Sequence, residues 1–219
     1  MDCCQCQAIE ERFDRKKAEK KRRAYQQGGL KRESQLLVDA LVAQGIDGYT
    51  LLDVGGGMGA LAIELIKRGV SRATINEAST AYLEAAAAET ESQGLTDQIS
   101  LVHGNIATMD QEIAPADVVT LDKVICCFDD MPGLVQSSLA KSRKLYGLVY
   151  PRDNWLVKAA FGFDNLIGRL QRSDFRVFVY PTKEVDGLIR GNGFQMRSSR
   201  NSAGWQIVVY GRVGAGTAV

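Results

Sequence analysis

A short stretch around position 55 has the residue types and spacing needed to hold a nucleotide-like ligand. Asp53 lies in an apolar run, Tyr49 to Val54, and the residues that follow include Gly55, Gly56, Gly57 and Gly59. Because glycine has no Cβ, the backbone can turn sharply here and let a ligand lie against it. The apolar run predicts a buried strand and Ala60 to Lys67 predicts a helix, whose free N–H groups would point at that ligand.

The glycines alone do not identify the ligand. Gly55, Gly57 and Ala60 also satisfy the G-x-G-x-x-A pattern of dinucleotide-binding proteins, so an NAD-dependent oxidoreductase is one interpretation. Asp53 argues against it, because a carboxylate two residues before the first glycine would repel a pyrophosphate. A cofactor that carries an amino group and a sulfonium would instead be attracted to this charge.

The order of the motifs resembles the class I S-adenosylmethionine-dependent methyltransferases, whose first motif is an acidic residue followed by Gly-x-Gly-x-Gly. The segment Ala73 to Ser79 is similar to the second strand of that family, which ends in an acid that binds both ribose hydroxyls. The resemblance therefore implies S-adenosyl-L-methionine as the cofactor and gives Glu77, with Ala78 beside it, the ribose contact.

Two further segments extend the resemblance. His103 to Ile106 stands where the family has Gly-Asp and an apolar residue at the adenine, which implies that Asn105 and Ile106 contact this ring. Asn105 replaces the usual Asp and can accept a hydrogen bond only through its uncharged amide oxygen. His103, the only histidine, is expected to form a wall of the adenine pocket and not to act as a base.

The segment Ala116 to Asp122 resembles the family's fourth strand, whose end faces the methyl acceptor. Asp122 and Lys123 are the main catalytic candidates, and Tyr25 in the N-terminal segment is a weaker one. An ionised carboxylate acceptor needs no strong base, whereas a hydroxyl, amine or carbon acceptor does. The expected substrate is a small molecule, an apolar or aromatic carboxylate or hydroxyl compound.

Hydrophobic periodicity predicts alternating strands and helices along the chain. The expected strands are 49–54, 72–77, 99–103, 117–122, 146–150, one from 193 and 205–212; the expected helices are 7–27, 34–43 with Ser34 as its cap, 59–68, 81–93 capped by Ser79, 134–145 and 184–190. This alternation predicts an α/β, Rossmann-like, mainly parallel seven-stranded sheet with helices on both faces.

Two segments are additions to this core. Residues 1–35 are predicted to form an N-terminal helical arm, and the domain 36–213 contains an insertion at about 152–176 that is predicted to be a helical lid; residues 214–219 form a tail. Trp155, Phe161 and Phe163 are candidate lid residues over the substrate, with packing on the core as the alternative. This layout loosely resembles the magnesium-protoporphyrin O-methyltransferase group.

Composition narrows the class of protein. The chain has 219 residues, 45% of them hydrophobic, and a net charge of +1, which suits one domain with one core and no overall attraction to nucleic acid or membrane. No apolar run approaches the roughly 20 residues that span a bilayer, and the first residues form no apolar signal region. A cytoplasmic location is therefore expected, whereas the oligomeric state is not indicated.

One segment departs from this overall neutrality. Between Arg12 and Arg23 there are eight basic and two acidic residues, so this segment carries +6 and the remainder of the chain carries −5, the difference from +1. One interpretation is a binding surface for RNA, which would make the protein an RNA methyltransferase. The other is a solvated helix face that docks through Ile9, Phe13 and Tyr25.

The five cysteines form two groups, Cys3, Cys4 and Cys6 near the beginning of the chain and Cys126 and Cys127 after the predicted fourth strand. An odd number with adjacent members does not suit a secreted disulfide framework. If the arm folds over the pocket, the thiolates could converge on zinc or another soft metal. Their spacing matches no standard zinc pattern, so ordinary small apolar packing is the alternative, and no metal is the main expectation.

Overall fold

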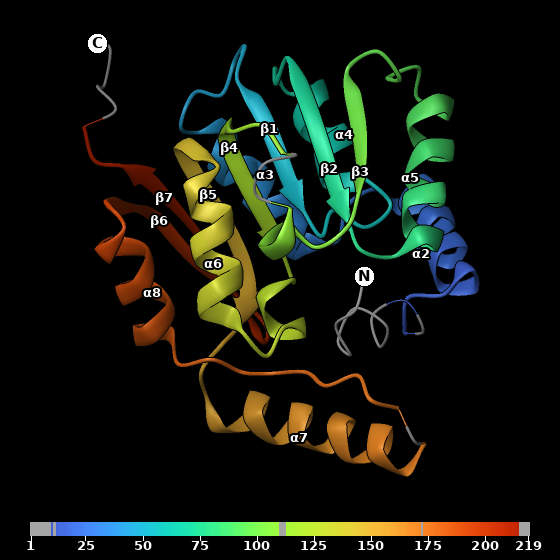
Figure 1. The fold of residues 1–219 in the computed structure, drawn as a ribbon, viewed down its shortest axis with the longest axis vertical. Coiled ribbons are helices and arrows are strands. Elements are labelled where there is room, and N and C mark those ends of the chain that lie inside the picture. The colour runs from blue at the N-terminus through green and yellow to red at the C-terminus, as the bar shows by residue number, and fades with distance from the viewer. Residues whose placement is uncertain (1–9, 11, 110–112, 172, 215–219) are drawn as a thin grey trace.

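A computed structural model describes residues 10, 12–109, 113–171 and 173–214 of the chain. Its centre is a seven-stranded sheet in the order β3-β2-β1-β4-β5-β7-β6, in which every pairing is parallel except those of β7 with its two neighbours (Figure 1). The strands are β1 (Thr50–Val54), β2 (Arg72–Glu77), β3 (Ile99–His103), β4 (Ala116–Asp122), β5 (Ser142–Pro151), β6 (Phe194–Ser202) and β7 (Trp205–Arg212).

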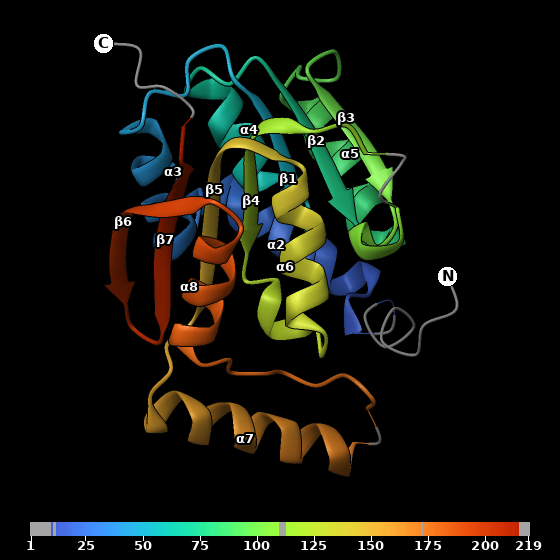
Figure 2. The same cartoon turned by 60° about the vertical axis from the view of Figure 1, so that its left-hand side comes forward.

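Helices cover both faces of the sheet. One face is covered by α3 (Arg32–Val42), α4 (Ala60–Lys67) and α5 (Thr80–Ser92), with α2 (Arg15–Gly28) packed against α5. The other face carries α6 (Met131–Ala140) and α8 (Thr182–Gly191), which contact each other (Figure 2). This is the predicted Rossmann-like class, with the predicted number of strands and the predicted α/β alternation.

The core consists of two apolar layers, one on each side of the sheet. Leu37 and Leu41 of α3 are fully buried and lie over Gly147 of β5, where a Cβ would come within 3.0 Å of the Leu37 side chain. The close approach fixes α3 against the sheet. The predicted boundary of the arm at residue 35 therefore falls inside a helix whose later turns belong to the core.

Several predicted boundaries differ from those in the structure. Helix α2 starts at Arg15, after an Asp14 cap that accepts from the Lys17 amide at 2.9 Å, and not at residue 7, although residues 1–9 are outside the described part. Helix α3 starts at Arg32, and Ser34 lies within it instead of capping it. Helix α6 ends at Ala140, because the residues from Ser142 onward already pair with β4 in strand β5. Phe194 opens a strand of nine residues.

The insertion after β5 is a helix, α7 (Trp155–Leu170), as predicted, but none of its residues is buried. It lies beyond the carboxyl ends of the strands and is separated from the sheet by the returning segment 173–181 (Figure 1). Asn165 ties the two together, since its side chain both donates to the Val177 carbonyl at 2.8 Å and accepts from the Val177 amide at 2.9 Å. Within the described residues, no helix is long and apolar enough to cross a membrane.

Candidate functional site

A cavity of about 470 Å³ opens at the carboxyl ends of β1, β2 and β4. Its wall combines the glycine loop with α2, α3 and the ends of these strands; among its residues are Asp53, Gly55, Gly56, Gly57, Glu77, Ala78, Asn105, Ile106, Asp122 and Lys123. Parallel strands gather their carboxyl ends at one edge of a sheet, which is where ligands bind in such folds. The volume lies in the range of about 300–1,000 Å³ that small-molecule and cofactor sites occupy.

The glycine loop joins β1 to α4 in a conformation that side chains disfavour. Gly55, Gly57 and Gly59 have φ values of +62°, +60° and +84°, and a Cβ at Gly56 would lie 2.7 Å from Oδ2 of Asp53. The Gly55 amide donates to the Asn76 carbonyl at 2.7 Å, which fixes the turn on the neighbouring strand. Gly59 does not line the cavity, and its φ and close packing account for the glycine there.

We expect Gly59→Ala to destabilise the fold by more than backbone strain alone. Its Cβ would lie 2.8 Å from Cδ1 of Ile75, a side chain that is fully buried. Gly94 has φ +67° and no atom within 4 Å of the same point, so Gly94→Ala is the matched control. Left-handed backbone costs a residue about 1–2 kcal/mol, and overpacking adds about 1–3 kcal/mol. Urea unfolding should show Gly59→Ala as the less stable variant; equal losses would contradict the steric argument.

Asp53 is a buried carboxylate directly beneath this loop. Its Oδ1 accepts a hydrogen bond from the Thr120 hydroxyl of β4 at 2.7 Å, whereas Oδ2 is buried and has no partner among the described residues. Burial raises the pKa of Asp53 to about 7, with the carboxylates of Asp122 and Glu77 adding to this effect and the bond from Thr120 opposing it. A cation or hydrogen-bond donor in the cavity would satisfy this oxygen.

Glu77 ends β2 with both carboxylate oxygens held in place. Oε2 accepts from the Gly57 amide at 2.9 Å and Oε1 from the Ser79 amide at 2.8 Å, so the side chain links the glycine loop to the start of α5. Burial raises the pKa of Glu77, and these two amide donors oppose the rise. Each oxygen retains a second lone pair, which suits it to accept from a pair of ligand hydroxyls.

The segment after β3 adds a third wall. Oδ1 of Asn105 accepts from the Ala107 amide at 3.0 Å and caps a 3₁₀ turn, Ile106–Thr108, and both Asn105 and Ile106 line the cavity. His103 does not line it, because its ring turns toward the Ala78 carbonyl, 3.0 Å from Nε2. The prediction that His103 forms a wall of the pocket is therefore wrong in this structure.

Asp122 lies at the end of β4 and lines the cavity, with one carboxylate oxygen hydrogen-bonded and the other buried. The Ser34 hydroxyl of α3 donates to Oδ2, whereas Oδ1 is buried without a partner among the described residues. Burial raises the pKa of Asp122, which the ammonium of Lys123 and the bond from Ser34 oppose. Ser34 was expected only as a helix cap, since no local pattern connects it to a strand 88 residues later in the chain.

Lys123 and Tyr25 also line the cavity, but their polar ends are already engaged. The Lys123 ammonium lies 3.2 Å from Oε2 of Glu33 and 5.1 Å from the centre of the Trp205 ring. The Tyr25 hydroxyl donates to Oε1 of Glu64 at 2.7 Å, and burial followed by this bond raises the pKa of Tyr25. Both polar ends therefore have partners in this structure, and a catalytic role for Lys123 or Tyr25 stays a prediction.

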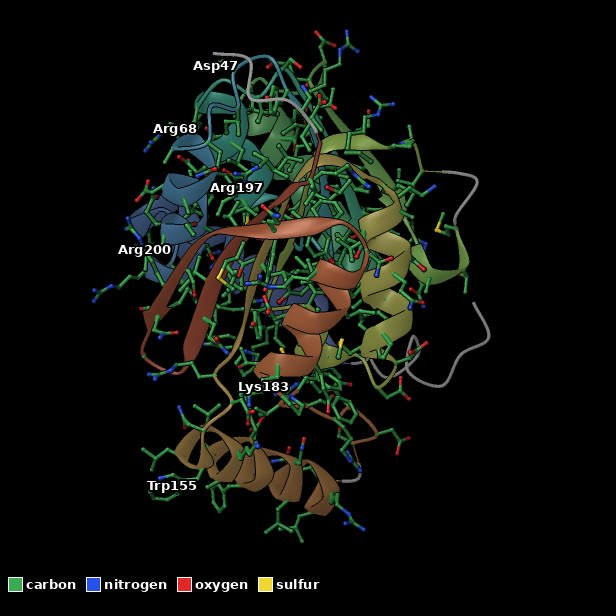
Figure 3. The ribbon with its side chains drawn as sticks, turned by 90° about the vertical axis from the view of Figure 1, so that its left-hand side faces the viewer. Asp47, Arg68, Trp155, Lys183, Arg197 and Arg200 are labelled. Atoms are coloured by element: carbon green, nitrogen blue, oxygen red, sulfur yellow. The ribbon has the colours of Figure 1, made fainter. Side chains whose placement is uncertain are left out.

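The candidate lid residues are not brought to the cavity. Phe161 packs edge-on against Trp205 with ring centres 6.1 Å apart, while the side chains of Trp155 and Phe163 are 74% and 65% exposed. Figure 3 shows Trp155 at the outer end of α7, directed away from the sheet. Phe161 therefore packs on the edge of the core through Trp205, whereas Trp155 and Phe163 do not, and the contact of all three residues with a substrate stays a prediction.

The cysteines are only partly visible. Cys3, Cys4 and Cys6 lie outside the described residues, so their convergence on the cavity is not tested. Cys126 is buried and Cys127 lines the cavity, and the two sulfur atoms lie 3.9 Å apart without a disulfide bond between them. Over the described ranges, no group of three or more His, Cys, Asp and Glu side chains is arranged to hold a metal ion.

A comparison of the sequence with protein-family models agrees with the fold and the cavity. Residues 51–140 match the family model described as a methyltransferase domain, a range that includes the glycine loop, Glu77 and Asp122. These residues therefore form an S-adenosylmethionine-dependent methyltransferase domain of the class I type. This decides between the two cofactors that the glycine pattern allowed: the methyltransferase uses S-adenosylmethionine, and the NAD-dependent alternative is wrong. Among curated proteins, none matches the sequence.

Several solved structures share the fold of this chain, although their sequences are less than 20% identical to it. Magnesium protoporphyrin IX methyltransferase from Synechocystis PCC 6803, with bound SAH, has a TM-score of 0.73 at 16% identity over 93% of this chain and 98% of that chain. An O-methyltransferase family protein from Burkholderia thailandensis has a TM-score of 0.72 at 18% identity, over 94% of this chain and 63% of that chain. An O-methyltransferase family 2 protein from Planctomyces limnophilus DSM 3776, in complex with apigenin, has a TM-score of 0.62 at 19% identity, over 85% of this chain and 63% of that chain. At these identities the likeness shows the fold.

Proposed function

We propose that the methyltransferase transfers the methyl group of S-adenosylmethionine to a hydroxyl group of an apolar or aromatic small molecule. The observation that carries this proposal is Oδ1 of Asp122, a buried carboxylate oxygen on the cavity wall without a partner in the described chain. Such an oxygen accepts a hydrogen bond from a protic acceptor and repels a carboxylate. The proposal therefore selects the hydroxyl compound from the two acceptor types that the sequence left open.

The cavity residues fit the methyl donor. We assign the ribose hydroxyls to Glu77, the adenine to Asn105 and Ile106, and the cationic end of the molecule to Asp53 and the loop of Gly55, Gly56 and Gly57. The unpartnered Oδ2 of Asp53 and the place of the Glu77 carboxylate in the cavity wall, held by two amide donors, are the observations that support this assignment. When bound, S-adenosylmethionine supplies an activated methyl group on a sulfonium.

The remaining chemistry belongs to the chain's own residues. Asp122, fixed through Oδ2 by Ser34, would orient the acceptor hydroxyl through Oδ1 and take its proton. The raised pKa of Asp122 makes it a stronger base than an exposed aspartate. Holding the two reactants in line and excluding water supplies much of the remaining rate enhancement.

A panel of acceptors tests the proposal. Purified methyltransferase, S-adenosylmethionine and matched pairs of aromatic alcohols and aromatic carboxylic acids would be incubated together, and S-adenosylhomocysteine release would be measured. Turnover on hydroxyl members of the pairs supports the proposal. Turnover on the carboxylic acids alone would overturn the acceptor assignment but leave the methyltransferase activity intact.

Asp53 gives the proposal a pH signature. A donor that binds the ionised form of a group with a pKa of about 7 must displace a proton below that pH, so its affinity should fall about tenfold between pH 8 and pH 6. Calorimetric titration with S-adenosylhomocysteine, which keeps the amino group, measures this. The Asp53→Asn variant should bind S-adenosylhomocysteine weakly and lose most of the dependence of affinity on pH. Any dependence that remains would come from Glu77. Asp39→Asn, an exposed change on α3, should retain it. A wild-type affinity independent of pH would contradict the contact with Asp53.

The RNA alternative rests on the basic segment 12–23, and the structure gives several of its cations structural partners. Arg22 donates to Glu89, a fully buried carboxylate of α5, at 3.0 Å, and Arg15 lies 3.5 Å from Glu84 on the same helix. Lys21 lies at the cavity wall. These contacts dock α2 on α5, which supports the small-molecule proposal. An RNA mobility shift that weakens steeply with salt would favour the alternative.

A further inference from the structure

The two adjacent cysteines that follow β4 form a nucleophilic cluster at the cavity wall that methyl transfer to a hydroxyl does not use. Cys126 and Cys127 lie in a 3₁₀ turn, Ile125–Cys127, and their sulfur atoms are 3.9 Å apart. Cys127 lines the cavity, while Cys126 is buried behind it. The cavity therefore gives a reagent a route to the pair through Cys127.

The backbone holds this pair in a fixed arrangement. Lys123, immediately before the turn, has a φ of +64°, which residues other than glycine rarely adopt, and its amide is held by the Val149 carbonyl at 2.8 Å. The turn itself is fixed by a bond from the Cys127 amide to Val124 and by a bond from the Phe178 amide to the Cys126 carbonyl, both 2.8 Å. Strain of this kind persists where surrounding contacts enforce it, which is common at functional sites.

Both thiols point to the same side of the turn. The sulfur of Cys126 lies 3.4 Å and that of Cys127 3.6 Å from one oxygen, the Lys123 carbonyl. Two thiolates bound to one tetrahedral ion with metal–sulfur bonds of about 2.3 Å would lie about 3.8 Å apart. The observed separation therefore allows both sulfurs to bind one centre with little movement of the turn.

The charges around the pair favour ionisation of one sulfur. A hydrogen bond from Cys126 lowers the pKa of Cys127, and the ammonium of Lys21 adds to this effect, while burial opposes it. Cys126 has the opposite shift, since its bond to Cys127 and its burial raise the pKa of its thiol.

We propose that Cys126 and Cys127 form a two-thiolate binding site for a soft metal ion or trivalent metalloid in the cavity wall beside Asp122. Thiolates prefer soft centres, and a monosubstituted trivalent arsenical needs two of them and no third protein ligand. This matches a cluster of two. The site lies next to the proposed acceptor position but does not depend on the identity of the acceptor.

Phenylarsine oxide is the probe, used with a full-length variant in which Cys3, Cys4 and Cys6 are serine. In its hydrated form two As–O bonds break and two As–S bonds form, the two thiol protons leave in water, and no atom changes its oxidation state. Intact-protein mass spectrometry should show one phenylarsenic group per chain. Peptide mapping of the folded adduct should place it on the fragment that carries both Cys126 and Cys127.

Further Cys126→Ser and Cys127→Ser changes in this background should each abolish the adduct, with thermal unfolding as the check on folding. The proposal is overturned if the Cys3, Cys4 and Cys6 variant forms no adduct, or if either further serine variant still forms it. The mapping on the folded parent needs no change at positions 126 and 127, so it decides the matter even if these variants fail to fold. S-adenosylhomocysteine binding, measured separately, tests the methyltransferase assignment without reference to the thiols.

Discussion

Asparagine in place of Asp122 should slow methyl transfer to a hydroxyl acceptor by about 10²–10⁴-fold, the contribution usual for a positioned general base. The amide keeps the size of the side chain and its bond to Ser34 through the carbonyl oxygen, but it has no oxygen basic enough to take the acceptor proton. S-adenosylhomocysteine affinity should change little, because Asp122 faces the acceptor. Steady-state kinetics with the acceptor found in the panel, together with calorimetry, measure both quantities.

Asp39→Asn is the control for this prediction. It makes the same chemical change on α3, the helix that carries Ser34, at an exposed position bonded to Gln35. Its rate and affinity should match those of the unchanged protein. Should Asp122→Asn retain the full rate, the acceptor needs no base from this position, and an already ionised acceptor would replace the hydroxyl in the proposal.

Ser34→Ala distinguishes positioning by Ser34 from a purely structural effect. The bond from Ser34 lowers the pKa of Asp122, so its loss should raise that pKa further. Since the base must be ionised, the limb of the pH–rate profile on which activity rises should move to higher pH, with a smaller loss of rate at the plateau than for Asp122→Asn. A stability loss with an unmoved pH profile would contradict the positioning argument.

The strands and the glycine loop were predictable because their signals are local. Strands β2 and β3 have the predicted bounds, and Ser79 caps α5 as expected, accepting from the Tyr82 amide at 3.3 Å. Periodicity of two or 3.6 residues and a capping hydroxyl are properties of neighbouring residues, which the sequence displays directly. The position of Asp53 and Glu77 then follows from the parallel order of the strands.

The parts that could not be predicted depend on contacts between distant segments. The end of α6 was placed at residue 145 because the residues of this stretch suit either a helix or a strand. Pairing with β4 and β7 decides for strand from Ser142. The bond between Ser34 and Asp122 and that between Arg22 and Glu89 likewise join segments far apart in the chain. No motif marks such pairs, so local sequence does not predict the residues that hold Asp122 and α2 in place.

The lid shows the same limit from the opposite direction. Its helix was recognisable from the spacing of the apolar residues in Trp155 to Leu170, but spacing cannot say which face meets the protein. In the structure Phe161 and Asn165 face inward, and the broad apolar face that includes Trp155, Leu156 and Phe163 faces outward. Which surface a helix covers depends on the assembled molecule, and two of the candidate lid residues, Trp155 and Phe163, lie on the exposed face.

Replacing Glu77 with alanine should weaken S-adenosylhomocysteine binding by about ten- to a hundredfold, the equivalent of one charge-assisted bond of about 1.5–3 kcal/mol. The carboxylate is nine-tenths buried, with only 8% of the residue exposed, and its oxygens are oriented by the Gly57 and Ser79 amides. Glu84→Ala, which removes an exposed glutamate of α5 that pairs with Arg15, should leave the affinity unchanged. Calorimetric titration measures all three proteins.

A loss of affinity in Glu77→Ala has two physical sources, because the side chain also holds the glycine loop through Gly57. A double cycle separates them, using the analogue of S-adenosylhomocysteine that lacks both ribose hydroxyls. If Glu77 binds the diol, removing the hydroxyls should weaken binding to the unchanged protein but have little further effect on Glu77→Ala. If Glu77 only orders the loop, the two losses should add, since the variant would still recognise the diol elsewhere. Additive losses would therefore show that Glu77 does not bind the ribose hydroxyls. Its carboxylate would then act only by holding the glycine loop and the start of α5 through the Gly57 and Ser79 amides.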